Sequence, residues 1–169
     1  MLKQILTGKH YIYWLALLGL GLLLEGMALI YQYALDFPPC VLCIHVRLWV
    51  MLMILVAGVG CLVYKTKLPN GLAHVLMAGV MAGMLERAWL LLGTERGFVL
   101  SSCNFNLGLP AWFAPDKWLP SIFEVQATCG YTPELFFGIT MAESLVVMST
   151  CLLLLSTALA ITVLASRSE

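Results

Sequence analysis

The chain has 169 residues, of which 62% are hydrophobic and 11% are charged, and its formal net charge is zero. A soluble domain of this size cannot bury so much apolar side chain, so the composition excludes a soluble globular protein and points to lipid as the solvent. The basic residues form no stripe, which argues against nucleic acid as a partner.

The N-terminus carries Lys3 and Lys9 ahead of a long apolar run. No small-residue cleavage site follows this run, so we expect a retained first span rather than a signal peptide. Four apolar stretches of about 20 residues each are long enough to cross the hydrocarbon core as helices. They cover residues 12–32, 44–63, 71–92 and 145–164. The sequence therefore predicts an all-α integral membrane protein, a single domain over residues 1–169 built as a four-transmembrane-helix bundle.

Three loops connect these spans, and their charges predict the orientation. The side with both termini and loop 64–70 holds five basic residues, which are Lys3, Lys9, Lys65, Lys67 and Arg167. The opposite side, with loops 33–43 and 93–144, holds only Arg96 and Lys117. Because basic residues stay in the cytoplasm, we expect cytoplasmic termini and two outward-facing loops. Four of the six cysteines lie in these outer loops, which in a bacterium face the oxidising periplasm.

The third loop is rich in aromatic and apolar residues, including Trp112 and Trp118. Such residues favour the headgroup region of a bilayer. We expect a short interfacial helix over residues 116–123, with Asp116 as its cap and Pro120 within its first turn. The alternative is a loop that only packs against the bundle.

Cys40 and Cys43 form a Cys-X-X-Cys pair, which is typical of redox sites but is also half of many zinc sites. Cys103 and Cys129 are available to complete a zinc site. However, the chain has no second Cys-X-X-Cys element, and an oxidising compartment favours disulfides, so we predict redox chemistry and no metal. Cys61 and Cys151 lie within apolar runs, where a thiol is usually an inert small hydrophobe.

Cys43 lies at the predicted start of the second span, where the helix dipole favours an anion. Arg47 is four residues further on, on the same helix face, and an arginine within a span usually marks function. A snorkelling arginine is the alternative. The pair needs a two-electron acceptor, and the chain has no iron–sulfur, haem or nucleotide motif. A quinone dissolved in the bilayer fits these constraints.

Several motifs together resemble the bacterial disulfide bond formation protein B (DsbB) family over almost the whole chain. They are Pro39-Cys40-Val41-Leu42-Cys43-Ile44 with Arg47, Cys103-Asn104-Phe105, Pro110-Ala111-Trp112, Asp116-Lys117-Trp118-Leu119-Pro120, and Cys129. The resemblance implies a multi-pass protein of the bacterial inner membrane that reoxidises the periplasmic thiol oxidase DsbA and reduces ubiquinone or menaquinone.

The same resemblance implies a role for each site residue. Cys103 and Cys129 form the disulfide that meets DsbA, and the DsbA thiolate attacks Cys103. Cys129 then attacks Cys40, and Cys43 leaves as a thiolate beside the quinone, which Arg47 helps to hold.

Two other functions fit part of the sequence. A vitamin K epoxide reductase-like protein also couples cysteines to a quinone, but its Cys-X-X-Cys pair is expected on the last span rather than at the start of the second. A four-span membrane protein with purely structural disulfides is the non-catalytic alternative. The redox potentials of the two cysteine pairs would separate it from an oxidase.

Overall fold

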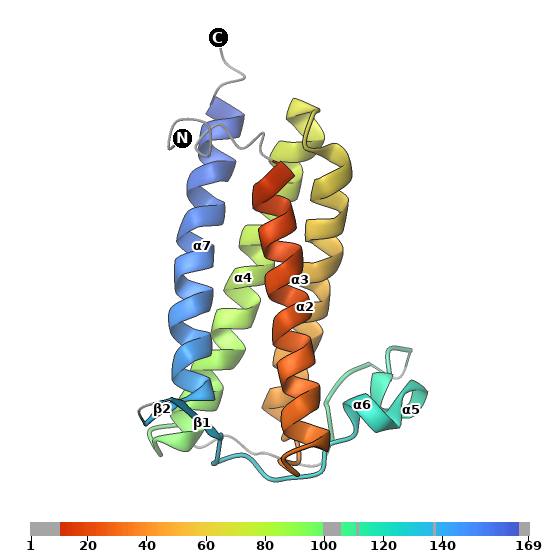
Figure 1. The fold of residues 1–169 in the computed structure, drawn as a ribbon, viewed down its shortest axis with the longest axis vertical. Coiled ribbons are helices and arrows are strands. Elements are labelled where there is room, and N and C mark those ends of the chain that lie inside the picture. The colour runs from red at the N-terminus through yellow and green to blue at the C-terminus, as the bar shows by residue number, and fades with distance from the viewer. Residues whose placement is uncertain (1–10, 100–105, 111, 137, 166–169) are drawn as a thin grey trace.

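The structure is a computed structural model that describes residues 11–99, 106–110, 112–136 and 138–165. Four long helices dominate it (Figure 1): α2 Tyr11–Tyr33, α3 Val41–Val63, α4 Lys67–Glu95 and α7 Met141–Ala165. Each of the four predicted spans lies within one of these helices. All four are long and apolar enough to cross a membrane, which confirms the predicted four-helix membrane fold.

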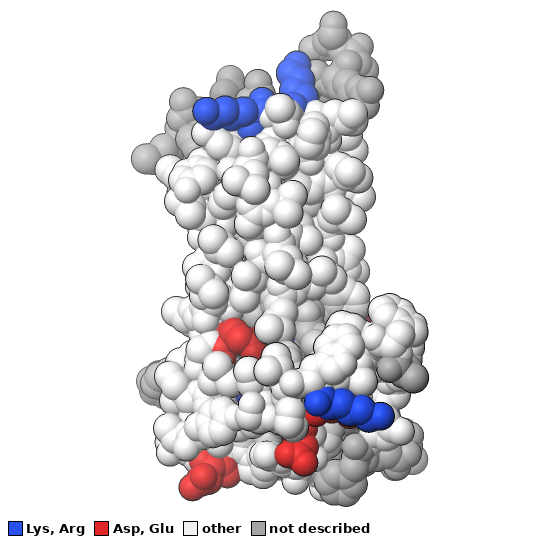
Figure 2. Space-filling model, turned by 90° about the vertical axis from the view of Figure 1, so that its right-hand side faces the viewer, with Lys and Arg blue, Asp and Glu red and all other residues white. Residues whose placement is uncertain are grey.

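The helices pack in chain order, α2 on α3, α3 on α4 and α4 on α7. Figure 1 shows the start of α2, the turn between α3 and α4 and the end of α7 at one end of the bundle. The remaining elements lie at the other end, which we call the loop end: α5 Pro115–Trp118, α6 Pro120–Phe123, β1 Glu134–Phe136 and β2 Ile139–Thr140. On the face shown in Figure 2, charged side chains gather toward the two ends and a broad uncharged belt lies between them. This distribution suits a bilayer.

Large side chains against glycines hold the bundle together. The indole of Trp14 is fully buried and covers Gly60, where an added Cβ would lie 2.2 Å from a ring carbon. The indole of Trp49 covers Gly83 in the same way, since a Cβ added at Gly83 would lie 2.4 Å from a carbon of the Trp49 ring. Methionines fill the space between the helices, because their unbranched side chains adapt to irregular gaps. Those with fully buried side chains are Met53, Met77, Met81 and Met84.

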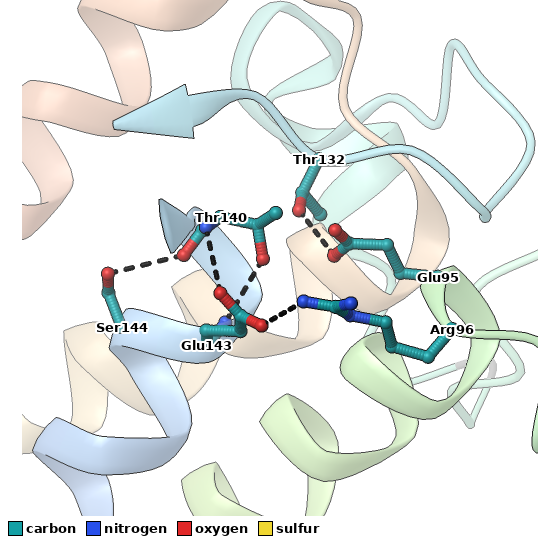
Figure 3. Close-up of polar contacts among 6 residues, drawn as sticks. All are labelled: Glu95, Arg96, Thr132, Thr140, Glu143 and Ser144. Atoms are coloured by element: carbon teal, nitrogen blue, oxygen red, sulfur yellow. Dashed lines mark hydrogen bonds and ion pairs between the residues drawn. The ribbon is translucent and has the colours of Figure 1, made fainter. Parts of the chain in front are cut away.

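Three helices begin earlier than the apolar runs predict. Helix α3 begins at Val41, so Cys40 is its N-cap. Helix α4 begins at Lys67 and carries Pro69 in its first turn, where the missing N–H costs little. Helix α7 begins at Met141, after a capping box in which the Thr140 hydroxyl accepts the Glu143 N–H and the Glu143 carboxylate accepts the Thr140 N–H (Figure 3).

The loop between α4 and α7 also differs in detail from the prediction. Residues 116–123 do not form one helix but two single turns, α5 and α6, that meet at Leu119. Leu119 has φ −138° and ψ 68°, outside the helical region, because the ring of Pro120 disfavours helical geometry at the residue before it. Asp116 lies in the first turn of α5, and the N-cap is Ala114. The β1–β2 hairpin was not predicted.

Candidate redox site

The Cys40–Cys43 pair lies where the loop after α2 turns into α3. Both residues are thiols, and their sulfur atoms are 2.8 Å apart. The backbone N–H of Cys43 donates to the Cys40 sulfur at 3.3 Å, so the sulfur takes the place of a capping oxygen. We expected the favourable helix end to act on Cys43. Because α3 begins at Val41, it acts on Cys40 instead.

This geometry activates Cys40. The hydrogen bond from the Cys43 side chain, helped by backbone N–H groups at the helix start, outweighs burial and lowers the pKa of the Cys40 thiol to about 7. Only 2% of Cys40 is exposed. At neutral pH, Cys40 is therefore more often a thiolate than an ordinary cysteine is, and the thiolate is the nucleophilic form.

Arg47 lies one turn further along α3 and points into the protein. Its guanidinium donates to the side chain of Gln32 at 2.6 Å and to the carbonyls of Ala28 at 2.8 Å and Ile122 at 2.9 Å. Arg47 is 6% exposed, which is not the geometry of a snorkelling side chain. These bonds use three of its five N–H donors. Arg47 therefore joins α3 to α2 and α6 and keeps donors for a further group.

A cavity of about 170 Å³ opens beside these residues. Its walls are mainly apolar side chains from the four long helices, which are Leu24 and Ala28 of α2, Val46 and Val50 of α3, Leu91 of α4, and Met141 and Leu145 of α7. Cys40, Cys43, Arg47 and Glu25 add polar groups to this lining. The cavity thus places both sulfurs, a guanidinium and a carboxyl around one apolar space.

The segment that carries Cys129 lies against Cys40. The backbone N–H groups of Gln126 and Ala127 donate to the carbonyl of Pro39 at 3.0 and 3.3 Å, and Ala127 pairs with Cys40 in a parallel β-bridge. Cys129 packs against the buried cluster that contains Cys40. Cys129 takes part in a disulfide. Cys103, the partner implied by the family resemblance, lies outside the described residues, so this pairing stays a prediction.

A polar contact ties this segment to α4, and a second contact joins α4 to α7 (Figure 3). The Thr132 hydroxyl, three residues after Cys129, donates to the Glu95 carboxylate at the end of α4 at 2.6 Å. The neighbouring Arg96 forms an ion pair with Glu143 at the start of α7. The segment of Cys129 is therefore attached to the end of α4, which is in turn joined to the start of α7.

Sequence reasoning missed the role of several of these residues. Gln32 is a polar residue near the end of a predicted span, and it receives the guanidinium of Arg47. Thr132 and Glu95 carried no sequence signal, because their contact depends on how the long loop folds back. The two remaining cysteines, Cys61 and Cys151, are thiols in α3 and α7 and do not line the cavity.

Comparison with known proteins gives a consistent result. A family profile described as "Disulfide bond formation protein DsbB" matches residues 10–159. "Disulfide bond formation protein B 2" of Pseudomonas aeruginosa is 34% identical over 152 residues, which cover 88% of this chain and 90% of the relative. "Disulfide bond formation protein B" of Shewanella sp. (strain MR-4) is 33% identical over 135 residues, 79% of this chain and 77% of the relative. The protein of the same name from Photorhabdus laumondii is 33% identical, with 79% of each chain covered.

Proposed function

The chain belongs to the disulfide bond formation protein B (DsbB) family, and on that basis we propose that it reoxidises a periplasmic DsbA-type thiol oxidase and passes the two electrons to a membrane quinone. The names of the relatives support disulfide oxidoreductase activity. The partner and the electron acceptor are our proposal, based on the family resemblance and on the site described above.

One observation carries the proposal. The segment that carries Cys129 pairs with Cys40, and Cys40, Cys43 and Arg47 together line an apolar cavity. Electrons that enter through the loop disulfide can thus pass to Cys40. From Cys43 they can pass to an acceptor bound in the apolar cavity. A purely structural pair of disulfides needs neither the lowered pKa of Cys40 nor the cavity.

The exchange steps balance through the four cysteines. A partner thiolate attacks Cys103 and breaks the Cys103–Cys129 disulfide, so Cys129 leaves as a thiolate. Cys129 attacks Cys40, and Cys43 leaves as a thiolate in turn. The second thiolate of the partner then releases Cys103 and departs as the oxidised partner. Finally Cys103 attacks Cys129, which restores the loop disulfide and leaves Cys40 and Cys43 reduced.

The Cys40–Cys43 pair then holds two electrons and two protons more than its disulfide, and it has to pass them on before the next cycle.

The cavity suits a quinone as acceptor. Its apolar walls match a hydrophobic ring and tail, and the donors that Arg47 keeps match a carbonyl oxygen. Arg47 and the walls from the four long helices would hold the quinone beside Cys43. When bound, ubiquinone or menaquinone supplies a two-electron, two-proton sink.

We further propose that the protein lies in the bacterial inner membrane with cytoplasmic termini. Lys65 and Lys67 lie at the end of the bundle opposite to the cysteine site, which supports this orientation. Lys3, Lys9 and Arg167, which also supported it, lie outside the described residues. The loop end, with its cysteines, would then face the periplasm and its soluble partner. Whether α5 and α6 lie on the membrane surface stays a prediction.

A turnover experiment tests the function. The purified protein in detergent is mixed with a reduced DsbA-type oxidase and ubiquinone, and quinone absorbance is followed. We expect bleaching that is abolished by Cys40→Ser or Cys103→Ser. Cys151→Ser is the matched control, because this exposed thiol lies away from the site, and it should turn over normally. Normal turnover in Cys40→Ser would refute the mechanism.

A further inference from the structure

Glu25 is the charged residue of the described cavity lining to which the proposed function gives no role. It lies in the middle of α2, and its side chain lines the same cavity as Cys43 and Arg47. Neither of its carboxyl oxygens has a hydrogen-bond partner among the described residues, although both oxygens are buried. An ionised carboxylate buried without a donor is costly, so a group in such a place needs a reason to be there.

One positive charge, that of Arg47, lies near Glu25 in the same cavity. The positive charge of Arg47 attracts a carboxylate, but the hydrogen bonds of Arg47 go to Gln32, Ala28 and Ile122 rather than to Glu25. Glu25 therefore shares the cavity with a positive charge to which it is not hydrogen-bonded.

Few other groups in the cavity are able to carry a proton at neutral pH. The titratable and charged residues that line it come from α2, the two loops and α3, and they are Glu25, Tyr31, Cys40, Cys43, Arg47 and Tyr131. Helices α4 and α7 contribute only apolar side chains, among them Leu91 and Leu145. The guanidinium keeps its proton, and Glu25 is the one carboxyl group among these described lining residues. Apart from the reacting thiols, the carboxyl of Glu25 is therefore the group suited to proton transfer.

We propose that Glu25 is the proton carrier of the site, taking one of the two protons of the reduced Cys40–Cys43 pair and delivering it to the quinone. In the reduced site, one proton is then on the Glu25 carboxyl and the other stays on Cys43, which donates to the Cys40 thiolate. When the Cys40–Cys43 disulfide forms, two electrons leave the sulfurs for the quinone. Glu25 releases one proton and Cys43 the other, so that hydroquinone is the product. This step rests on the proposed function.

Infrared difference spectroscopy tests proton uptake without quinone. A variant with Cys103→Ser and Cys129→Ser leaves Cys40–Cys43 as the site's only reducible pair, and its reduced-minus-oxidised spectrum is recorded. We expect a carboxylic-acid C=O band on reduction that is lost in Glu25→Gln. Glu86→Gln is the matched control, because Glu86 is also on a long helix but is paired with Arg87 and lies outside this cavity. A spectrum without this band, or a band that persists in Glu25→Gln, would overturn the proposal.

Kinetics separate a proton carrier from a residue that only neutralises Arg47. Proton transfer by a positioned group typically contributes 10²–10⁴-fold, so Glu25→Gln should lower kcat for quinone reduction by about 100-fold with little change in KM. Glu25→Asp should recover part of this rate, and disulfide exchange between the cysteine pairs should be unaffected. An effect on KM alone would overturn the proposal. Absence of quinone reduction in the unmodified protein would instead refute the proposed function, since the infrared band does not depend on it.

Discussion

The pKa of Cys40 gives the sharpest prediction for the isolated site. The hydrogen bond from the Cys43 side chain is the largest cause that lowers this pKa from 9.0 to about 7. The difference corresponds to about 3 kcal/mol in favour of the thiolate, at 1.36 kcal/mol per pH unit. In the reduced protein, the Cys40 thiolate should therefore form at a clearly lower pH than the thiolate of an ordinary cysteine.

The perturbation is Cys43→Ala, which removes the side-chain donor, compared with Cys43→Ser, which keeps one. In a background without Cys61 and Cys151, thiolate absorbance is titrated while the loop disulfide stays oxidised. We expect Cys43→Ala to raise the pKa of Cys40 toward the ordinary thiol value and Cys43→Ser to raise it less. Titration of Cys40 near 9 in the unmodified protein, or equal values in the two variants, would refute this account of its activation.

The same shift has a consequence for stability. The folded pKa of Cys40 is below the unfolded value, so the stabilisation of the reduced protein is fully present above about pH 9 and is lost as the pH falls through about 7. The oxidised protein has no thiol at this position and should lack this dependence. Unfolding of the two redox forms in detergent at several pH values would measure the difference.

Three further changes test other parts of the structure. Arg47→Lys keeps the positive charge but loses the planar guanidinium and one of its hydrogen bonds. The loss of roughly one charged hydrogen bond should raise the apparent KM for quinone about tenfold. An unchanged KM would show that Arg47 does not bind the quinone. Thr132→Val removes the hydrogen bond to Glu95, whereas Thr132→Ser keeps it. In a Cys43→Ser, Cys103→Ser background, Thr132→Val should slow the formation of a Cys40–Cys129 disulfide and Thr132→Ser should not. Equal rates in the two variants would show that this hydrogen bond does not position Cys129. Gly60→Ala places a methyl group against Trp14 and should cost about 1–3 kcal/mol of stability, whereas Gly58→Ala, which has open space, should be tolerated in thermal unfolding.

The sequence predicts the four spans correctly because each is a long apolar run, and only a helix of that length satisfies its backbone in lipid. It does not predict where the helices begin, since those positions depend on caps. Cys40 caps α3 with sulfur, and the Thr140–Glu143 capping box that starts α7 is visible in the sequence but lies ahead of the apolar run. Pro120 is also visible, yet its effect on Leu119 splits the expected surface helix into two turns.

The sequence also predicts one part of the site and not another. Spacing along one helix places Cys40, Cys43 and Arg47 together, because residues four apart share a face. The acceptors of Arg47 come from α2 and α6, and the segment that carries Cys129 reaches Cys40 through backbone hydrogen bonds to Pro39. Such contacts join residues far apart in the chain and follow from the packing of the long loop, for which a single sequence holds no periodic signal.

A single-turnover count of electrons tests the central claim most directly. A known amount of reduced DsbA-type oxidase is added to the protein and excess ubiquinone without oxygen, and partner disulfide and hydroquinone are measured together. Electron flow through Cys103–Cys129 and Cys40–Cys43 predicts one hydroquinone for each partner disulfide formed. Partner oxidation without hydroquinone, or hydroquinone formation that persists in Cys40→Ser, would contradict it.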